Sequence, residues 1–166
     1  MTTYKMSILM PNKKILAVDP GYERLGIAVL ESGNLLYSEC FQTDKKFPHS
    51  KRIEQIGTHL AKIIKKYSPS VFAIETLFFS KNQKTALLVS EARGALLYIA
   101  AREGLEIREF SPADVKIGVT GYGRSTKNQI ISMVPKIIHI GKEIRFDDEF
   151  DAIAVGITCE ATKKFE

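Results

Sequence analysis

Residues 14–31 read KILAVDPGYERLGIAVLE, and this stretch decides the fold. An apolar run over 14–19 ends in Asp19 and is followed by a Pro-Gly pair, which predicts a buried strand and then a turn. A second apolar run, over 25–31, begins so soon afterwards that the two strands can form a hairpin. The tripeptide SGN then marks another turn, so residues 35–41 are predicted to complete an antiparallel meander.

The rest of the chain alternates helices with strands. Residues 49–67 show apolar side chains at helical spacing, and residues 71–75 (VFAIE) form a continuous apolar strand. Because a helical crossover precedes this strand, it is predicted to run parallel to the first strand. The further predicted elements are a helix over 85–102, a strand over 105–110, and helices over 126–138 and 148–162.

We therefore expect an α/β fold with a five-stranded mixed sheet and helices on both faces. A single domain covers residues 14–166, and residues 1–13 form a loose N-terminal extension. The apolar share of 45% and the charged share of 26% exclude a disordered or collagen-like chain. The net charge of +5 is compatible with a nucleic-acid partner but does not require one.

The two cysteines, Cys40 and Cys159, match neither a disulfide framework nor a zinc cluster. They indicate buried thiols in a reducing cytoplasm. The apolar run near the N-terminus is too short for a signal-peptide core or a membrane span, so we expect no membrane association.

Two acidic residues close apolar strands: Asp19 ends the first strand and Glu75 ends the fourth. If these strands are parallel neighbours, both carboxylates emerge at the carboxyl edge of the sheet, where open α/β sheets bind ligands. Asp148 and Asp151 lie three residues apart at the start of the last helix and share one face. Each acid alone could be a turn former or a helix cap, but their convergence indicates a site.

Carboxylates held together in apolar surroundings raise one another's pKa unless a cation lies between them. All-oxygen ligands favour Mg²⁺, with Mn²⁺ as a substitute, over zinc. Two such ions about 4 Å apart would hold the attacking and leaving oxygens of a phosphodiester in line. The predicted chemistry is metal-assisted phosphodiester hydrolysis, with these catalytic and metal-ligating residues: Asp19, Glu75, Asp148 and Asp151.

Basic and aromatic residues near these acids are candidate DNA contacts. Lys116 and Lys127 flank a segment with three glycines, and Arg124 lies between them. Interpreted as a loop, this segment could approach phosphate closely and neutralise its charge, although such loops are also common as plain solvated surface. Phe78 and Lys81 lie just past the fourth strand, where an aromatic ring can stack on bases or belong to the core.

The helix over 85–102 is apolar around much of its circumference, whereas a helix covering one face of a sheet needs a single apolar stripe. The excess indicates either a contact with a second copy of the chain or a helix enclosed within the monomer.

Six segments occur in an order that resembles the RuvC family of Holliday-junction resolvases: DPGYERLGIAVLE, FAIETLFFSKN, SEARGALL, ADVKIGVTGYG, TKNQ and DDEFDAIAVGITC. The resemblance extends over about residues 15–159 and implies a ribonuclease H-like fold. It also implies a homodimeric, Mg²⁺-dependent endonuclease that nicks two strands of a four-way junction symmetrically in recombination and DNA repair. Two ions per site, a cytoplasmic location and a branch-migration helicase as a partner follow from the same resemblance.

The resemblance places the family's catalytic acids on the four carboxylates, its stacking phenylalanine on Phe78, and its basic positions near the scissile phosphate on Lys116 and Lys127. Some relatives carry histidine where this chain has Asp148, whose neighbours Asp147 and Glu149 are also acidic. Alternatives are a related nuclease for flaps or RNA–DNA hybrids and a non-cleaving junction-binding module. A phosphotransferase of the actin-like class needs two such domains, for which 166 residues leave no room.

Overall fold

The computed structural model describes residues 13–77 and 83–162, which form a five-stranded sheet in the order β3-β2-β1-β4-β5. The antiparallel meander of β1 to β3 is confirmed, and β1 pairs in parallel with β4, as predicted. A second parallel pairing joins β4 to β5. The strands are β1 (Ile15–Asp19), β2 (Arg24–Glu31), β3 (Asn34–Gln42), β4 (Val71–Glu75) and β5 (Glu106–Phe110).

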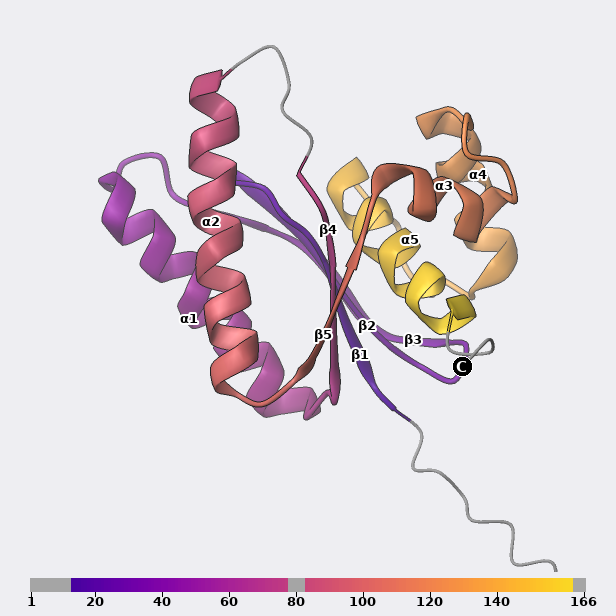
Figure 1. The fold of residues 1–166 in the computed structure, drawn as a ribbon, viewed down its shortest axis with the longest axis horizontal. Coiled ribbons are helices and arrows are strands. Elements are labelled where there is room, and N and C mark those ends of the chain that lie inside the picture. Colours follow the sequence, from indigo (N-terminus) through magenta and orange to yellow (C-terminus); the bar gives the residue numbers. More distant parts are fainter. Residues whose placement is uncertain (1–12, 78–82, 163–166) are drawn as a thin grey trace, which may run out of the picture.

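Helices cover both faces of the sheet, which confirms the predicted layers. Figure 1 shows α1 and α2 on one face and α3, α4 and α5 on the other. Half of the predicted element boundaries differ from the observed ones by one or two residues, and the other half agree. The helices are α1 (His49–Tyr67), α2 (Gln83–Arg102), α3 (Pro112–Thr120), α4 (Lys127–Ile137) and α5 (Asp147–Thr162).

The central strand β1 is buried on both faces, which explains its unbroken apolar sequence. Ile15 and Ala17 pack with α5 on one face, while Leu16 and Val18 pack with α1 and α2 on the other. All four side chains are fully buried. Successive side chains of a strand point to opposite faces, so a strand between two helical layers needs apolar residues at every position.

Helix α5 packs so closely against the sheet and α3 that two of the contact positions have room only for glycine. A Cβ on Gly26 of β2 would lie 1.8 Å from the main-chain carbonyl oxygen of Asp148 in the first turn of α5. On the outer side of α5, a Cβ on Gly118 would lie 2.4 Å from Oγ1 of Thr158. These two glycines therefore fix how deeply α5 sits between the sheet and α3.

The sequence predicts no helix over residues 112–120, and the interpretation of the segment from Lys116 to Lys127 as a loop is wrong for residues 116–120. Ser111 and Asp114 form a reciprocal capping box at its start, and Gly121 ends it with φ of 76°. A capping box and a proline in the first turn favour a helix over a loop. Lys116 and Gly118 consequently lie on a helix, and only residues 121–126 connect it to α4.

Helix α2 is an outer helix rather than one enclosed within the monomer. Its fully buried residues are Ala92, Leu96 and Ala100, whereas Leu87 is 64% exposed and Tyr98 is 65% exposed. The enclosed-helix alternative is therefore wrong, and apolar side chains of α2 face solvent in the single chain. No helix within the described ranges combines the length and the apolar character needed to cross a membrane.

The close packing of α5 against β2 can be tested with a pair of glycine variants. We expect Gly26→Ala to lower the free energy of unfolding by roughly 1–3 kcal/mol, because its methyl group meets main-chain atoms that cannot yield by a side-chain rotation. The control Gly141→Ala adds a methyl group at an ordinary 3.9 Å contact and should change stability by less than about 0.5 kcal/mol. Urea denaturation followed by circular dichroism measures both. Equal stability of the two variants would contradict the close approach.

Candidate active site

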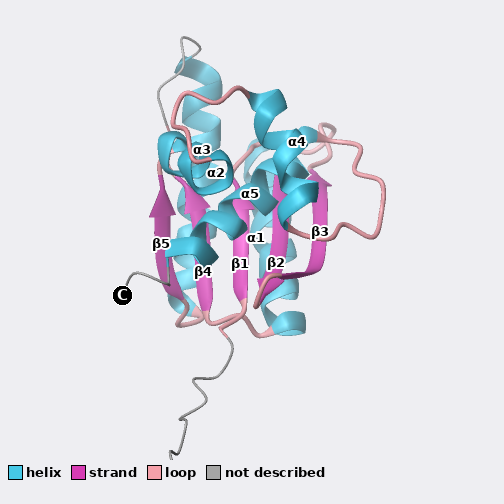
Figure 2. Cartoon of the chain, turned by 90° about the vertical axis from the view of Figure 1, so that its right-hand side faces the viewer, coloured by secondary structure: helices cyan, strands magenta, loops and turns pink. Residues whose placement is uncertain are grey.

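Two carboxylates lie at the same edge of the sheet because β1 and β4 are parallel neighbours. Val18 pairs with Ile74 in the ladder, and Asp19 and Glu75 are the next residues on the two strands. Figure 2 shows the arrowheads of β1, β4 and β5 directed to this edge. Asp148 and Asp151 approach it from the first turns of α5, whose start is fixed against Gly26.

Electrostatic coupling shows that the four acids share one neighbourhood centred on Asp19. Burial first, and then the charges of Asp151, Glu75 and Asp148 in that order, together raise the pKa of Asp19 to about 8, although the charge of Lys127 lowers it. Burial and Asp151 likewise raise the pKa of Glu75 to about 7, against the opposing charges of Lys116 and Lys127. The four acids are therefore electrostatically coupled, and nearby positive charge balances only part of their negative charge.

Lys127 supplies part of the positive charge that balances these acids. Its Nζ lies 2.9 Å from Oδ2 of Asp151 and 3.5 Å from Oδ2 of Asp147. Burial opposes its charged form, but the two aspartates outweigh that effect and raise the pKa of Lys127. A capping box between Thr126 and Gln129 begins α4 and holds Lys127 in its first turn.

Arg24 is a site residue that the sequence interpretation missed. Its Nε lies 3.3 Å from Oδ2 of Asp148, and its guanidinium lies over the ring of Phe146 at 5.4 Å from the centroid. The available signal was its position: a hairpin that leaves Asp19 places the first residue of β2 at the same edge of the sheet. The contact itself joins residues far apart in the sequence, so only the folded chain reveals it.

The structure separates three consecutive acids that the sequence left ambiguous. Glu149 is 5% exposed, accepts a hydrogen bond of 2.6 Å from Oγ of Ser38, and lies 2.6 Å from Nζ of Lys142. It therefore belongs to a buried network that joins α5 to β3. The side chain of Asp147 is 61% exposed. Asp148 is the intervening acid, and its charge acts on Asp19.

The donor set fits a divalent cation of the Mg²⁺ or Mn²⁺ type. The four carboxylates offer only oxygen atoms, and a cation between them would relieve both the burial and the mutual repulsion that raise the pKa of Asp19 and Glu75. In the part of the chain that the structure describes, no three His, Cys, Asp or Glu side chains converge closely enough to hold a metal ion as they stand.

The predicted DNA-contacting residues occupy different surroundings. Lys116 lies on α3, close enough to Glu75 to lower its pKa. Arg124 is exposed on the segment between α3 and α4, and this segment is fixed by a 2.6 Å hydrogen bond between the hydroxyl groups of Thr120 and Ser125. Two other predicted contacts lie outside the described residues: Phe78 and Lys81.

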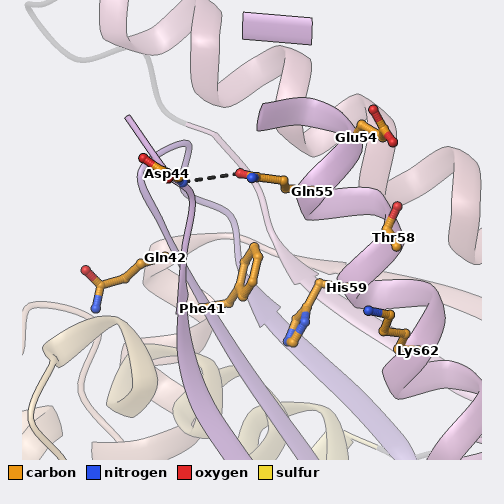
Figure 3. Close-up of a pocket in the computed structure, with 8 residues that line it drawn as sticks. All are labelled: Phe41, Gln42, Asp44, Glu54, Gln55, Thr58, His59 and Lys62. Atoms are coloured by element: carbon orange, nitrogen blue, oxygen red, sulfur yellow. Dashed lines mark hydrogen bonds between the residues drawn. The ribbon is translucent and has the colours of Figure 1, made fainter. Parts of the chain in front are cut away.

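A surface pocket lies between the end of β3 and α1 (Figure 3). The ring of Phe41 stacks on His59 with centroids 4.0 Å apart, and the backbone N–H of Asp44 donates a 3.2 Å hydrogen bond to Oε1 of Gln55. None of the predicted site residues that the structure describes lines this pocket.

The mixed sheet with acids at the ends of its central parallel strands defines a protein of the ribonuclease H-like class. The family model described as "Crossover junction endodeoxyribonuclease RuvC" matches residues 15–159. A protein of that name from Thermosipho melanesiensis is 44% identical over 146 residues, which are 86% of this chain and 93% of the relative. The chain therefore belongs to the RuvC family.

A second relative and one solved structure agree with this assignment, and another solved structure shares the fold. The protein of the same name from Thermotoga maritima is 38% identical over 150 residues, covering 88% of this chain and 89% of its own. The Thermus thermophilus RuvC structure in complex with a Holliday junction substrate is 25% identical, has a TM-score of 0.84, and is matched over 92% of this chain and 96% of that one. The yeast mitochondrial Holliday junction resolvase shares the fold, with a TM-score of 0.70 at 12% identity over 93% of this chain and 80% of its own.

The raised pKa values predict that the metal-free protein loses stability as pH rises. Asp19 and Glu75 have ordinary values of 3.8 and 4.5 but pKa values of about 8 and about 7 in the folded chain. The folded state therefore binds more protons than the unfolded state between about pH 4 and pH 8, and the free energy of unfolding falls across that window. Asp19→Asn should flatten this dependence and raise stability at about pH 8 by roughly 1–3 kcal/mol.

Urea denaturation in EDTA at about pH 5 and about pH 8 measures this effect. The control Asp114→Asn removes an exposed helix-capping carboxylate whose pKa is lowered by hydrogen bonds from Ser111, so it should leave the decline between these pH values in place. A wild-type protein that gains stability over the same range would contradict the electrostatic description of the cluster.

Proposed function

We propose that this chain is a divalent-metal-dependent endodeoxyribonuclease that resolves four-way DNA junctions by paired symmetric nicks in recombination and DNA repair. The observation that carries the proposal is the coupled cluster around Asp19, because all four of its carboxylates lie within the segment that matches the RuvC family. A non-cleaving junction-binding module is disfavoured, since such a module has no need to retain four mutually repelling acids.

In this proposal, Asp19, Glu75, Asp148 and Asp151 hold Mg²⁺, with two ions per site. A bound ion would supply an activated water and neutralise charge on the phosphodiester. The acids must be deprotonated to bind a cation. The raised pKa values of Asp19 and Glu75 disfavour their ionised forms in the metal-free site, and a bound cation would favour those forms. Metal affinity should therefore increase between about pH 6 and pH 8.

Two lysines are placed to act on the phosphate. Lys127 contacts Asp151, so it can orient that acid and offset charge in the transition state. Lys116 acts on Glu75 from α3 and would approach the scissile phosphate from the other side of the cluster. Arg124 would bind the DNA backbone beside them. From the family resemblance alone, Phe78 would stack on a base and Lys81 would bind DNA.

Paired nicks need two active sites, and α2 offers a surface for a homodimer. Leu87 and Tyr98 are exposed and lie 11 residues apart, which is about three helical turns and therefore the same side of the helix. Apolar side chains on one face of an outer helix favour contact with a second copy of the chain. A cytoplasmic location and a branch-migration helicase as a further partner are expectations from the resemblance alone.

Cleavage of synthetic DNA tests the substrate. We expect an immobile four-way junction to be cut at paired, symmetric positions only with Mg²⁺ or Mn²⁺, and much faster than a flap, an RNA–DNA hybrid or a linear duplex. Asp19→Asn should bind the junction in Ca²⁺ but cut it at least ~100-fold more slowly, because it lacks the central carboxylate.

Faster cleavage of the flap or the hybrid than of the junction would show that the flap or the hybrid is the preferred substrate. Full activity of Asp19→Asn would overturn the assignment of the four carboxylates. Junction binding without any cleavage by the wild-type protein would favour the non-cleaving module instead.

The dimer surface has its own matched test. Leu87→Asp places a charge on the exposed face of α2, so we expect it to convert a dimer into a monomer in sedimentation velocity and to abolish paired nicking. Leu36→Asp is the control, because Leu36 is also an exposed apolar residue, at 41%, but lies on β3. A dimer that persists in Leu87→Asp, or that is lost equally in both variants, would rule out this face.

A further inference from the structure

An arginine of α2 contacts the end of β4. Nε of Arg93 donates a hydrogen bond of 3.1 Å to the main-chain carbonyl oxygen of Glu75. The side chain of Arg93 is 16% exposed, so it is largely enclosed between the helix and the sheet. It lies in the segment SEARGALL, for which neither the metal chemistry nor the DNA contacts require a role.

A second nitrogen of the same guanidinium group contacts β5. Nη2 of Arg93 forms an ion pair with Glu109 of β5, so the arginine joins α2 to two neighbouring strands at once. Because the guanidinium group is planar and rigid, two simultaneous contacts fix its orientation far better than an ammonium group could. Two residues earlier, Oε2 of Glu91 lies 2.7 Å from Nε2 of His49, which also ties α2 to α1.

Glu75 needs this restraint because it lies at the end of the sheet pairing. The parallel ladder between β1 and β4 ends at Val18 and Ile74. Beyond it, the chain is held on the β5 side by a 2.8 Å hydrogen bond from the backbone N–H of Thr76 to the carbonyl oxygen of Phe110. Repulsion from Asp151 acts on the carboxylate of Glu75. Arg93 is the contact from the helical layer that opposes displacement of this strand end.

We propose that Arg93 is a positioning residue that holds the end of β4 so that Glu75 can bind the divalent cation; this rests on the proposed metal-dependent function. Its hydrogen bond goes to the main chain of Glu75, and its charge is paired with Glu109. The charges that act on the Glu75 carboxylate come from Asp151, Lys116 and Lys127. Arg93 thus sets the place of this ligand rather than its charge.

A purely stabilising ion pair is the competing interpretation, and Glu109→Gln separates the two. This variant removes the ion pair but keeps the hydrogen bond from Arg93 to Glu75, whereas Arg93→Gln removes both. If the pair were only structural, the two variants would have the same effect. If Arg93 positions Glu75, only Arg93→Gln should impair metal binding.

The direct measurement is Mn²⁺ affinity by titration calorimetry, with Asp19→Asn as the reference for a damaged site. Residues that orient metal ligands typically contribute 10- to 100-fold to metal affinity. We expect about tenfold weaker binding for Arg93→Gln, less than about twofold for Glu109→Gln, and about threefold for Arg93→Lys, which keeps a donor without the rigid fork. Lys51→Gln breaks the surface ion pair of Lys51 with Glu54 on α1 and should have no effect.

Two further readouts support or overturn the proposal. Arg93→Gln should raise the Mg²⁺ concentration for half-maximal junction cleavage and speed hydrogen exchange at the Thr76 amide, with junction binding in Ca²⁺ unchanged. Equal Mn²⁺ affinities of Arg93→Gln and Glu109→Gln would overturn it. If Arg93→Gln does not fold, an unchanged affinity of Arg93→Lys has the same meaning. Absence of junction cleavage by the wild-type protein would instead refute the proposed function, while Mn²⁺ binding and exchange would still decide the role of Arg93.

Discussion

The parallel pairing of β1 with β4 is the constraint on which the rest of the structure depends. It brings Asp19 and Glu75 side by side at one edge of the sheet, each at the end of a strand buried between two helical layers. Burial and mutual repulsion then raise the pKa of Asp19 to about 8 and that of Glu75 to about 7. The metal-free site is therefore destabilising at neutral pH, and the surrounding fold must hold it in place.

Two kinds of contact hold the acidic site in place: some balance its charge, and others fix the position of α5. Lys127 contacts Asp151, and Arg24 contacts Asp148, so each acid of α5 has a cationic neighbour. Position is fixed by contacts outside the four acids: Gly26 lets α5 approach β2, and the buried network of Glu149 joins the start of that helix to β3. These contacts keep mutually repelling acids together without a direct bond between them.

Much of the fold and the acidic cluster was predictable because the signals are local and periodic. The apolar strands, the parallel direction of β4 and the three-residue spacing of Asp148 and Asp151 are all readable in the sequence, and the structure agrees with them. The helix α3 was missed because the glycines around Lys116 outweighed the capping box at Ser111. In the folded chain, Gly118 serves close packing against Thr158 rather than flexibility.

The sequence by itself determined the five strands, every helix except α3, and which acids are candidates for the site, because strand periodicity, residue type and family pattern are properties of the chain in order. Only the tertiary structure decided that Glu149 belongs to a buried network with β3, which cations oppose the acids, and what holds Glu75. The contacts of Arg24 with Asp148 and of Arg93 with Glu75 join separate elements. Their distances depend on how helices pack on the sheet, and no local pattern in the sequence encodes that packing.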